Sequence, residues 1–201
     1  MTATPDIQVK PDAHPWLVAG SWRLDRAESF ASFTARLPGR RVRGRLPLSG
    51  QVLITEPIDE SLALLTARTS AISTGSPVLD RLLAGPAFLD ARAYPEITFQ
   101  SDLLVLVPSG WRAVGRLQVK DAEHELACEF GVQVGDAGLG SAPRPVVTCS
   151  WVIDSTWIAS QRIPALHRRV EMTCSFQLEP ISATASCRQR DGRRTKRALS
   201  S

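Results

Sequence analysis

Histidine and cysteine are the residue types in this chain that most often carry catalysis or bind metals, and there are three of one and four of the other. His14, His124 and His167 are far apart, and His124 follows Asp121 in an expected surface turn. A Ser-His-Asp triad or a zinc site needs partners in a recognisable arrangement, and the sequence contains no CxxC pair and no His/Cys set at zinc-ligand spacing. We therefore expect no catalytic residues, no metal and no cofactor.

The cysteines fit a structural role better than a chemical one. Cys128, Cys149 and Cys174 alternate with polar residues, so they resemble small buried hydrophobic side chains. The sequence shows no signal peptide and no apolar run approaching the roughly 18 residues of a membrane span. These features predict a cytosolic protein, in which the cysteines, Cys187 included, stay reduced.

Arginine could provide a clamp for an anionic head group, because guanidinium binds phosphate in a bidentate way. A solvated outer face is the competing interpretation, and we favour it for most of these residues. Arg81 is the strongest candidate because it lies with Asp80 on an expected helical insertion. The arginines considered are Arg36, Arg43, Arg45, Arg68, Arg81 and Arg92.

The positive charge is concentrated at the C-terminus. Residues 181–201 hold six basic residues and Asp191, a net of +5, whereas residues 1–180 carry −1. The sequence pI of about 9.2 therefore describes the tail, and we expect no nucleic-acid partner. The tail is predicted to be disordered and solvated, with weak contact to an anionic membrane surface as the next interpretation.

Strands dominate the part of the chain between its ends. Residues 29–37, 126–134 and 170–178 alternate between apolar and polar side chains with period two, which is typical of antiparallel strands with one wet face. Weaker candidates bring the expected number to about eight. The expected organisation is a flexible arm (1–18), a barrel domain (19–180) and a basic tail (181–201). The weaker strand candidates are 50–56, 61–70, 95–107, 111–120 and 146–154.

One segment interrupts the strands. Residues 76–90 carry Leu79 and Leu83 at helical spacing, with Ser76 as N-cap, Pro77 at the first helical position and Gly85 at the end. A second helical turn near 162–169 is only weakly indicated. Eight antiparallel strands can close into a barrel that is solid or holds one small ligand, although a β-sandwich would give the same alternation.

Three segments carry a resemblance to a known family: SWRLDRAESFASFTARL at 21–37, LDRLLAGPAFLDARAYPEITFQS at 79–101 and WRAVGRLQVKDAEHELACEF at 111–130. In order and spacing they resemble the YceI-like family, a group of lipocalin-like lipid-binding β-barrels. The resemblance spans roughly 21–178. It departs from the family at Arg36, where a His is usual, and at 154–157, where an expected Gly is missing. It implies an all-β, eight-stranded antiparallel barrel with a short helical insertion and a pocket for a polyisoprenoid or other long-chain amphiphile.

The expected function is therefore non-covalent binding of an isoprenoid or fatty-acyl lipid, without catalysis. Two alternatives stay open: a solid barrel that acts as an interaction module, and an enzyme acting on a bound lipid with Asp80 or Glu96 as acid–base group. A homodimer is an open alternative to a monomer. The expected ligand-binding residues are Phe33, Ala35, Leu37, Ile97, Phe99, Leu117, Phe130, Trp151, Met172, Phe176 and Arg81.

Overall fold

Antiparallel strands make up most of the described part of the chain. The computed structural model describes residues 18–37, 39–107, 110–134, 144–159 and 168–181, and within these ranges it contains nine strands, one α-helix and three short 3-10 helices. The strands are β1 (Gly20–Leu24), β2 (Phe30–Leu37), β3 (Arg40–Ile54), β4 (Leu62–Arg68), β5 (Glu96–Val107), β6 (Gly110–Val119), β7 (Ala122–Val134), β8 (Pro145–Asp154) and β9 (Arg169–Pro180). The helices are α1 (Pro77–Ala84), η2 (Ile58–Glu60), η3 (Thr69–Ala71) and η4 (Ser155–Trp157).

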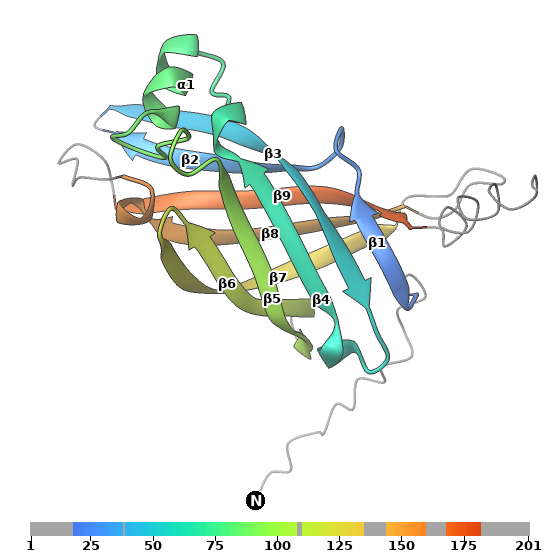
Figure 1. The fold of residues 1–201 in the computed structure, drawn as a ribbon. Coiled ribbons are helices and arrows are strands. Elements are labelled where there is room, and N and C mark those ends of the chain that lie inside the picture. The colour runs from blue at the N-terminus through green and yellow to red at the C-terminus, as the bar shows by residue number, and fades with distance from the viewer. Residues whose placement is uncertain (1–17, 38, 108–109, 135–143, 160–167, 182–201) are drawn as a thin grey trace, which may run out of the picture.

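The sheet closes on itself. Hydrogen-bonded neighbours follow the order β1-β3-β2-β9-β8-β7-β6-β5-β4, and β4 pairs again with β3. Both β1 and β2 lie between β3 and β9: β1 pairs with Val52 and Pro180, and β2 pairs with Gly44 and Met172. The nine described strands thus fill eight positions of a closed antiparallel barrel (Figure 1), which confirms the fold predicted from the sequence.

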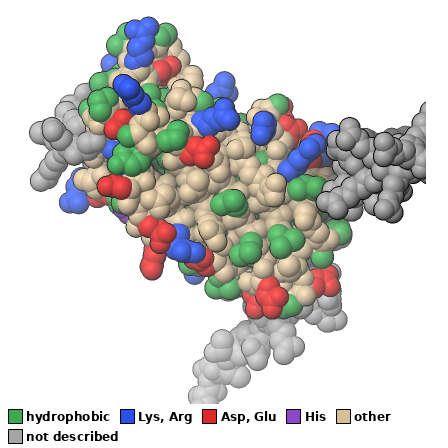
Figure 2. All heavy atoms as spheres, in the orientation of Figure 1, with side chains coloured by type: hydrophobic (Ala, Val, Ile, Leu, Met, Phe, Trp, Pro, Cys, Tyr) green, Lys and Arg blue, Asp and Glu red, His purple; other side chains and the backbone are tan. Residues whose placement is uncertain are grey.

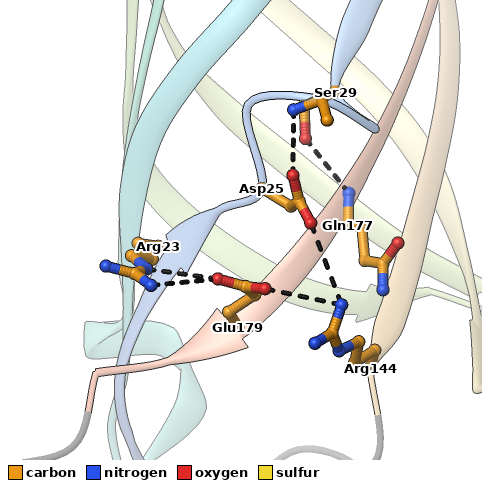
Figure 3. Close-up of polar contacts among 7 residues, drawn as sticks. Arg23, Asp25, Ser29, Arg144, Gln177 and Glu179 are labelled. Carbon is orange, nitrogen blue, oxygen red and sulfur yellow. Dashed lines mark hydrogen bonds and ion pairs between the residues drawn. The ribbon is translucent and has the colours of Figure 1, made fainter.

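A short break at residues 25–29 separates β1 from β2 (Figure 3). The backbone N–H of Asp25 donates to the carbonyl oxygen of Gln177 at 2.9 Å, and the N–H of Gln177 donates to Ser29 Oγ at 3.2 Å. Asp25 also accepts a hydrogen bond from the N–H of Ala27 at 2.8 Å, which fixes the turn. Because both backbone groups of Gln177 are bonded across the break, the barrel stays closed there.

The strand β3 is longer than its pattern suggested. The sequence predicts a strand at 50–56, whereas β3 begins at Arg40, so the predicted start is wrong by ten residues. Val42 and Gly44 occupy inward positions in this run, but glycine gives no hydrophobic signal. The ring of Phe33 covers Gly44 from β2, and a Cβ atom at position 44 would lie 2.5 Å from that ring. A close approach of aromatic ring to backbone therefore replaces the missing side chain.

The helical insertion joins β4 to β5 and caps one end of the barrel (Figure 1). Helix α1 begins after Ser76 and ends before Gly85, as predicted, although it is shorter than the 76–90 segment. Asp80 holds its start, because its Oδ1 accepts from the backbone N–H of Thr74 at 2.7 Å and from the hydroxyl at 2.6 Å. Among the described residues, no helix has the length and apolar character needed to cross a membrane.

The strands run from residue 20 to residue 180, inside the barrel domain expected from the sequence. The predicted arm and tail lie almost entirely outside the described residues, as does most of the weak helical turn at 162–169.

Candidate ligand-binding cavity

An apolar cavity of about 130 Å³ lies inside the barrel. Each of the eight barrel positions contributes at least two side chains to its wall, for example Phe33 from β2 and Phe99 from β5. Leu83 of α1, with Phe88 and Leu89 just after it, closes the end that the insertion caps. The barrel is therefore hollow in part, and the cavity reaches the insertion.

The cavity occupies only one half of the barrel. On β7 its wall includes Leu126 and Cys128, close to the capped end, whereas Phe130 lies farther along the strand and outside the lining. On β9 it includes Cys174 but not Phe176, which is buried beyond it. We call the half next to α1 the hollow half, and the half that contains β1 the filled half. Buried side chains of the filled half are Trp22, Leu24, Val52, Ile54, Leu104, Trp111, Val147, Phe176 and Leu178.

The predicted ligand-binding residues divide between these halves. Ala35 is buried near the cavity without lining it, and the side chain of Leu37 is not among those described. Phe130 stacks on Trp111 with ring centroids 6.3 Å apart and is part of the filled half. Arg81 is exposed on α1, with no hydrogen-bond partner among the described residues. The predicted residues that line the cavity are Phe33, Ile97, Phe99, Leu117, Trp151 and Met172.

The ligand-binding residues expected from the sequence did not include the insertion residues Leu83, Phe88 and Leu89, nor the three buried cysteines. Phe88 and Leu89 follow the end of α1 in a turn, where helical spacing gives no guide to direction, and Leu89 is buried. Ile158 reaches the cavity from the turn after η4. Strand alternation did point Cys128, Cys149 and Cys174 inward, but it could not show that their side chains border a void.

These three thiols form a row across the cavity wall. Cys149 lies opposite Cys174 in the β8–β9 pairing, Cys128 is on β7, and all three are free. Hydrogen bonding to Cys149 and burial raise the pKa of Cys128 well above its usual range. For Cys149, the hydrogen bond with Cys128 acts to lower the pKa, but the bond with Cys174 and burial outweigh it and raise the pKa to about 12. The thiols of Cys128 and Cys149 are therefore uncharged at neutral pH.

Two aromatic residues, Trp151 and His124, each have a buried ring nitrogen with no hydrogen-bond partner among the described residues. Trp151 lines the cavity, and its indole N–H has no acceptor. His124 stacks on Trp157 with ring centroids 4.0 Å apart, and its Nε2 is buried without a partner. The expectation of a surface position for His124 is thus wrong, because η4 brings Trp157 over the ring.

Among the described residues, no Asp, Glu or His side chain lines the cavity wall. Asp80 is engaged by Thr74, and Glu96 is exposed at the start of β5 opposite Arg68. No group of three or more His, Cys, Asp or Glu side chains within the described ranges is arranged to hold a metal ion. What the arrangement can do is enclose a hydrocarbon and exclude water from it.

Solved structures with the same fold include a protein from Burkholderia cenocepacia named BcnA, 18% identical, with a TM-score of 0.65 over 77% of this chain and 98% of that one. A polyisoprenoid-binding domain from Saccharophagus degradans, implicated in plant cell wall breakdown, is 16% identical, with a TM-score of 0.60 over 80% of this chain and 98% of that one. A YceI protein from Campylobacter jejuni is 15% identical, with a TM-score of 0.61 over 70% and 86%.

No curated protein matches the sequence. The model of the YceI-like domain matches residues 22–178, which is most of the chain and all but the outermost ends of the closed barrel. With the cavity, the capping insertion and this match taken together, the chain belongs to the YceI-like family.

Proposed function

We propose that this protein binds the hydrocarbon part of a long-chain amphiphile, polyisoprenoid or fatty-acyl, inside the hollow half of the barrel. The observation that carries the proposal is an apolar cavity walled by all eight barrel positions and closed by the insertion. The polyisoprenoid-binding domain with the same fold adds support. An apolar lining of this kind favours a hydrocarbon, because a hydrocarbon can be buried there without polar groups of its own that would be left without hydrogen-bond partners.

The cavity volume bears on how the ligand is held. An engineered cavity of about 150 Å³ lined by apolar side chains stays dry and binds benzene, so 130 Å³ accommodates a segment of comparable size. A longer chain needs more room, and the side chains able to provide it are Met172, Leu83 and Phe88, the last two in the cap. We infer that the insertion containing Leu83 and Phe88 shifts when a long hydrocarbon chain enters the cavity.

Carriage rather than catalysis fits the chemistry of the wall. The thiols of Cys128 and Cys149 have raised pKa values and are therefore poor nucleophiles, because the thiolate is the reactive form. Asp80 and Glu96, the acid–base alternatives, do not line the cavity. The cytosolic location, the homodimer alternative and the membrane contact of the tail stay predictions from the sequence.

Native mass spectrometry of the purified protein, before and after solvent extraction, tests the proposal. A bound mass of several hundred daltons that extraction removes supports a carrier. In the variant Ala67→Ile, extra carbons enter the cavity from β4 and should exclude the ligand. The matched control is Ala127→Ile on the exposed outer face of β7, which should bind normally. Protein that stays free of ligand after incubation with isoprenoid and fatty-acyl lipids would favour the interaction module instead.

A further inference from the structure

The arginines of the barrel differ in how they are paired. Arg23, Arg36 and Arg112, on the outer face, form salt bridges with carboxylates of neighbouring strands, at 3.2, 2.7 and 2.6 Å. Arg116 and Arg168 do the same with Asp102 and Asp154. Cross-strand pairing of this kind neutralises the outer face of the barrel where it occurs.

A second group of arginines forms no salt bridge with any described residue. Arg41, Arg43 and Arg45 are exposed at alternate positions of β3, so they point outward in a row with about 7 Å between neighbours. Others lie on α1 and around the insertion. The full group at this end of the barrel is Arg40, Arg41, Arg43, Arg45, Arg68, Arg81 and Arg92.

We call residues 40–45 and 68–96 the basic cap. It holds seven arginines against Asp80, Asp90 and Glu96, a net of +4. The other described residues hold nine basic and 13 acidic side chains, a net of −4. The described part of the protein is therefore neutral as a whole but strongly polarised. Figure 2 shows Lys and Arg side chains along the upper edge of the view, over α1 and the β2–β3 pair, with acidic side chains among them.

The basic cap is continuous with the cavity. Ser73, just before α1, exchanges backbone hydrogen bonds with Arg45 at 2.8 and 2.9 Å, which fastens the insertion beside the arginine row. On α1 itself, Leu83 lines the cavity, whereas Val78 and Leu82 are 74% and 50% exposed. The helix thus presents apolar side chains outward next to unpaired arginines and closes the cavity with its other face.

We propose that the basic cap is a docking surface for an anionic lipid bilayer. Unpaired arginines attract lipid phosphates, and exposed Val78 and Leu82 can enter the head-group region beside them. The positive charge of the basic cap is complementary to an anionic bilayer, and the cavity ends at this same surface, where a lipid could pass between bilayer and barrel. That exchange of lipid between bilayer and barrel rests on the function proposed above, whereas the docking itself rests on the arginines.

Vesicle sedimentation of the full chain tests the docking. The vesicles are phosphatidylcholine with or without phosphatidylglycerol, at low and physiological salt. We expect binding only to the anionic vesicles, weakened by salt. The triple variant Arg41→Gln/Arg43→Gln/Arg45→Gln should bind on the order of 100-fold more weakly. The matched control Arg23→Gln/Arg112→Gln/Arg144→Gln removes the same charge from salt-bridged arginines at the filled end and should bind as the natural protein does.

The apolar contribution has its own pair of variants. Val78→Ser/Leu82→Ser should weaken vesicle binding about tenfold, because two partly inserted apolar side chains are lost. Leu62→Ser/Leu64→Ser changes two side chains of comparable exposure on β4, at the filled end, and should leave vesicle binding unchanged.

Several outcomes would overturn the inference. They are equal binding to neutral vesicles, a basic-cap arginine variant that binds normally, and loss of binding in the control at the filled end. Binding to duplex DNA in place of vesicles, lost in the arginine variant, would identify a nucleic-acid surface instead. Native mass spectrometry of the same samples separates the two proposals: an empty cavity with arginine-dependent vesicle binding would refute lipid carriage and leave the docking surface standing.

Discussion

The two halves of the barrel are built from the same strands but differ in packing, polar pairing and charge. In the filled half, Trp22 is buried and its indole N–H donates to the carbonyl of Val18 at 3.2 Å. In the hollow half, Trp151 borders the cavity and its N–H has no acceptor among the described residues. The hollow half thus leaves volume and the Trp151 hydrogen-bond donor unused.

Net charge follows the same division, although salt-bridged arginines such as Arg36 and Arg168 occur at the hollow end as well. At the filled end, Arg144 lies between Asp25 and Glu179 (Figure 3), and Glu179 also pairs with Arg23. At the hollow end, the arginine row of β3 has no such partners among the described residues. The comparison teaches that the tightly packed half and the proposed binding half lie at opposite ends of one sheet, so variants should separate stability from binding.

The largest expected effect concerns packing. Phe176→Ala, in the filled half, should lower the free energy of unfolding by about 3–5 kcal/mol, because it removes a buried ring and leaves a new void. Phe99→Ala should cost roughly 1–2 kcal/mol less, since a ring that borders a cavity already lacks neighbours on one side. Urea unfolding of both variants measures the difference. An equal or larger loss for Phe99→Ala would show that the hollow half is packed as tightly as the filled one.

The next effect concerns the thiol row. The pKa of Cys149 is raised to about 12 from an ordinary value near 9, so its contribution to stability is fully present below about pH 9 and is lost as the pH rises towards 12. Between pH 9 and 10.5 the loss should reach about 2 kcal/mol. Urea unfolding as a function of pH tests this. Cys149→Ala should lose less stability over that interval, and identical pH profiles would contradict the raised pKa.

Period-two alternation predicted much of this comparison. It identified which face of β2, β7 and β9 points inward, and it placed Phe33, Phe99 and Met172 correctly in the interior. The alternation could not predict how far along the barrel axis each inward residue lies. Cys128 and Phe130 both point inward by this pattern, but only Cys128 borders the cavity. The position of a residue along the barrel axis depends on strand tilt and register, which are properties of the closed sheet.

The insertion and the charges were harder to predict. The sequence located α1 through its capping residues, but the burial of Leu89 depends on a turn with no periodic signal. The first part of β3, which carries the arginines at 40–45, was not predicted as a strand, because Gly44 interrupts its apolar face. Whether an arginine is paired depends on the strand opposite it: Arg36 meets Glu171 of β9, whereas Arg43 lies opposite Thr34.

A smaller effect concerns the unused donor. A ligand with an ether, carbonyl or hydroxyl oxygen could accept a hydrogen bond from Trp151, so the natural protein should prefer it over the matching pure hydrocarbon by about 1 kcal/mol, or roughly fivefold. Trp151→Phe should lose this preference. Trp22→Phe, whose N–H is already bonded, is the control and should keep it. Competitive binding followed by native mass spectrometry measures the ratio, and a preference unchanged in Trp151→Phe would exclude this hydrogen bond.

The smallest effect concerns the arginines themselves and separates stability from docking. Arg112→Gln breaks an exposed bridge to Glu129, so it should lower the free energy of unfolding by less than about 1 kcal/mol. Arg43→Gln breaks no described salt bridge and relieves repulsion from Arg41 and Arg45, so it should leave stability unchanged or raise it by a few tenths of a kcal/mol. Thermal unfolding at low salt, where surface charges act most strongly, is the measurement. Raised salt should shrink both differences. A larger loss for Arg43→Gln than for Arg112→Gln would mean that the arginine row holds the fold together, and a surface kept for docking would then need another explanation.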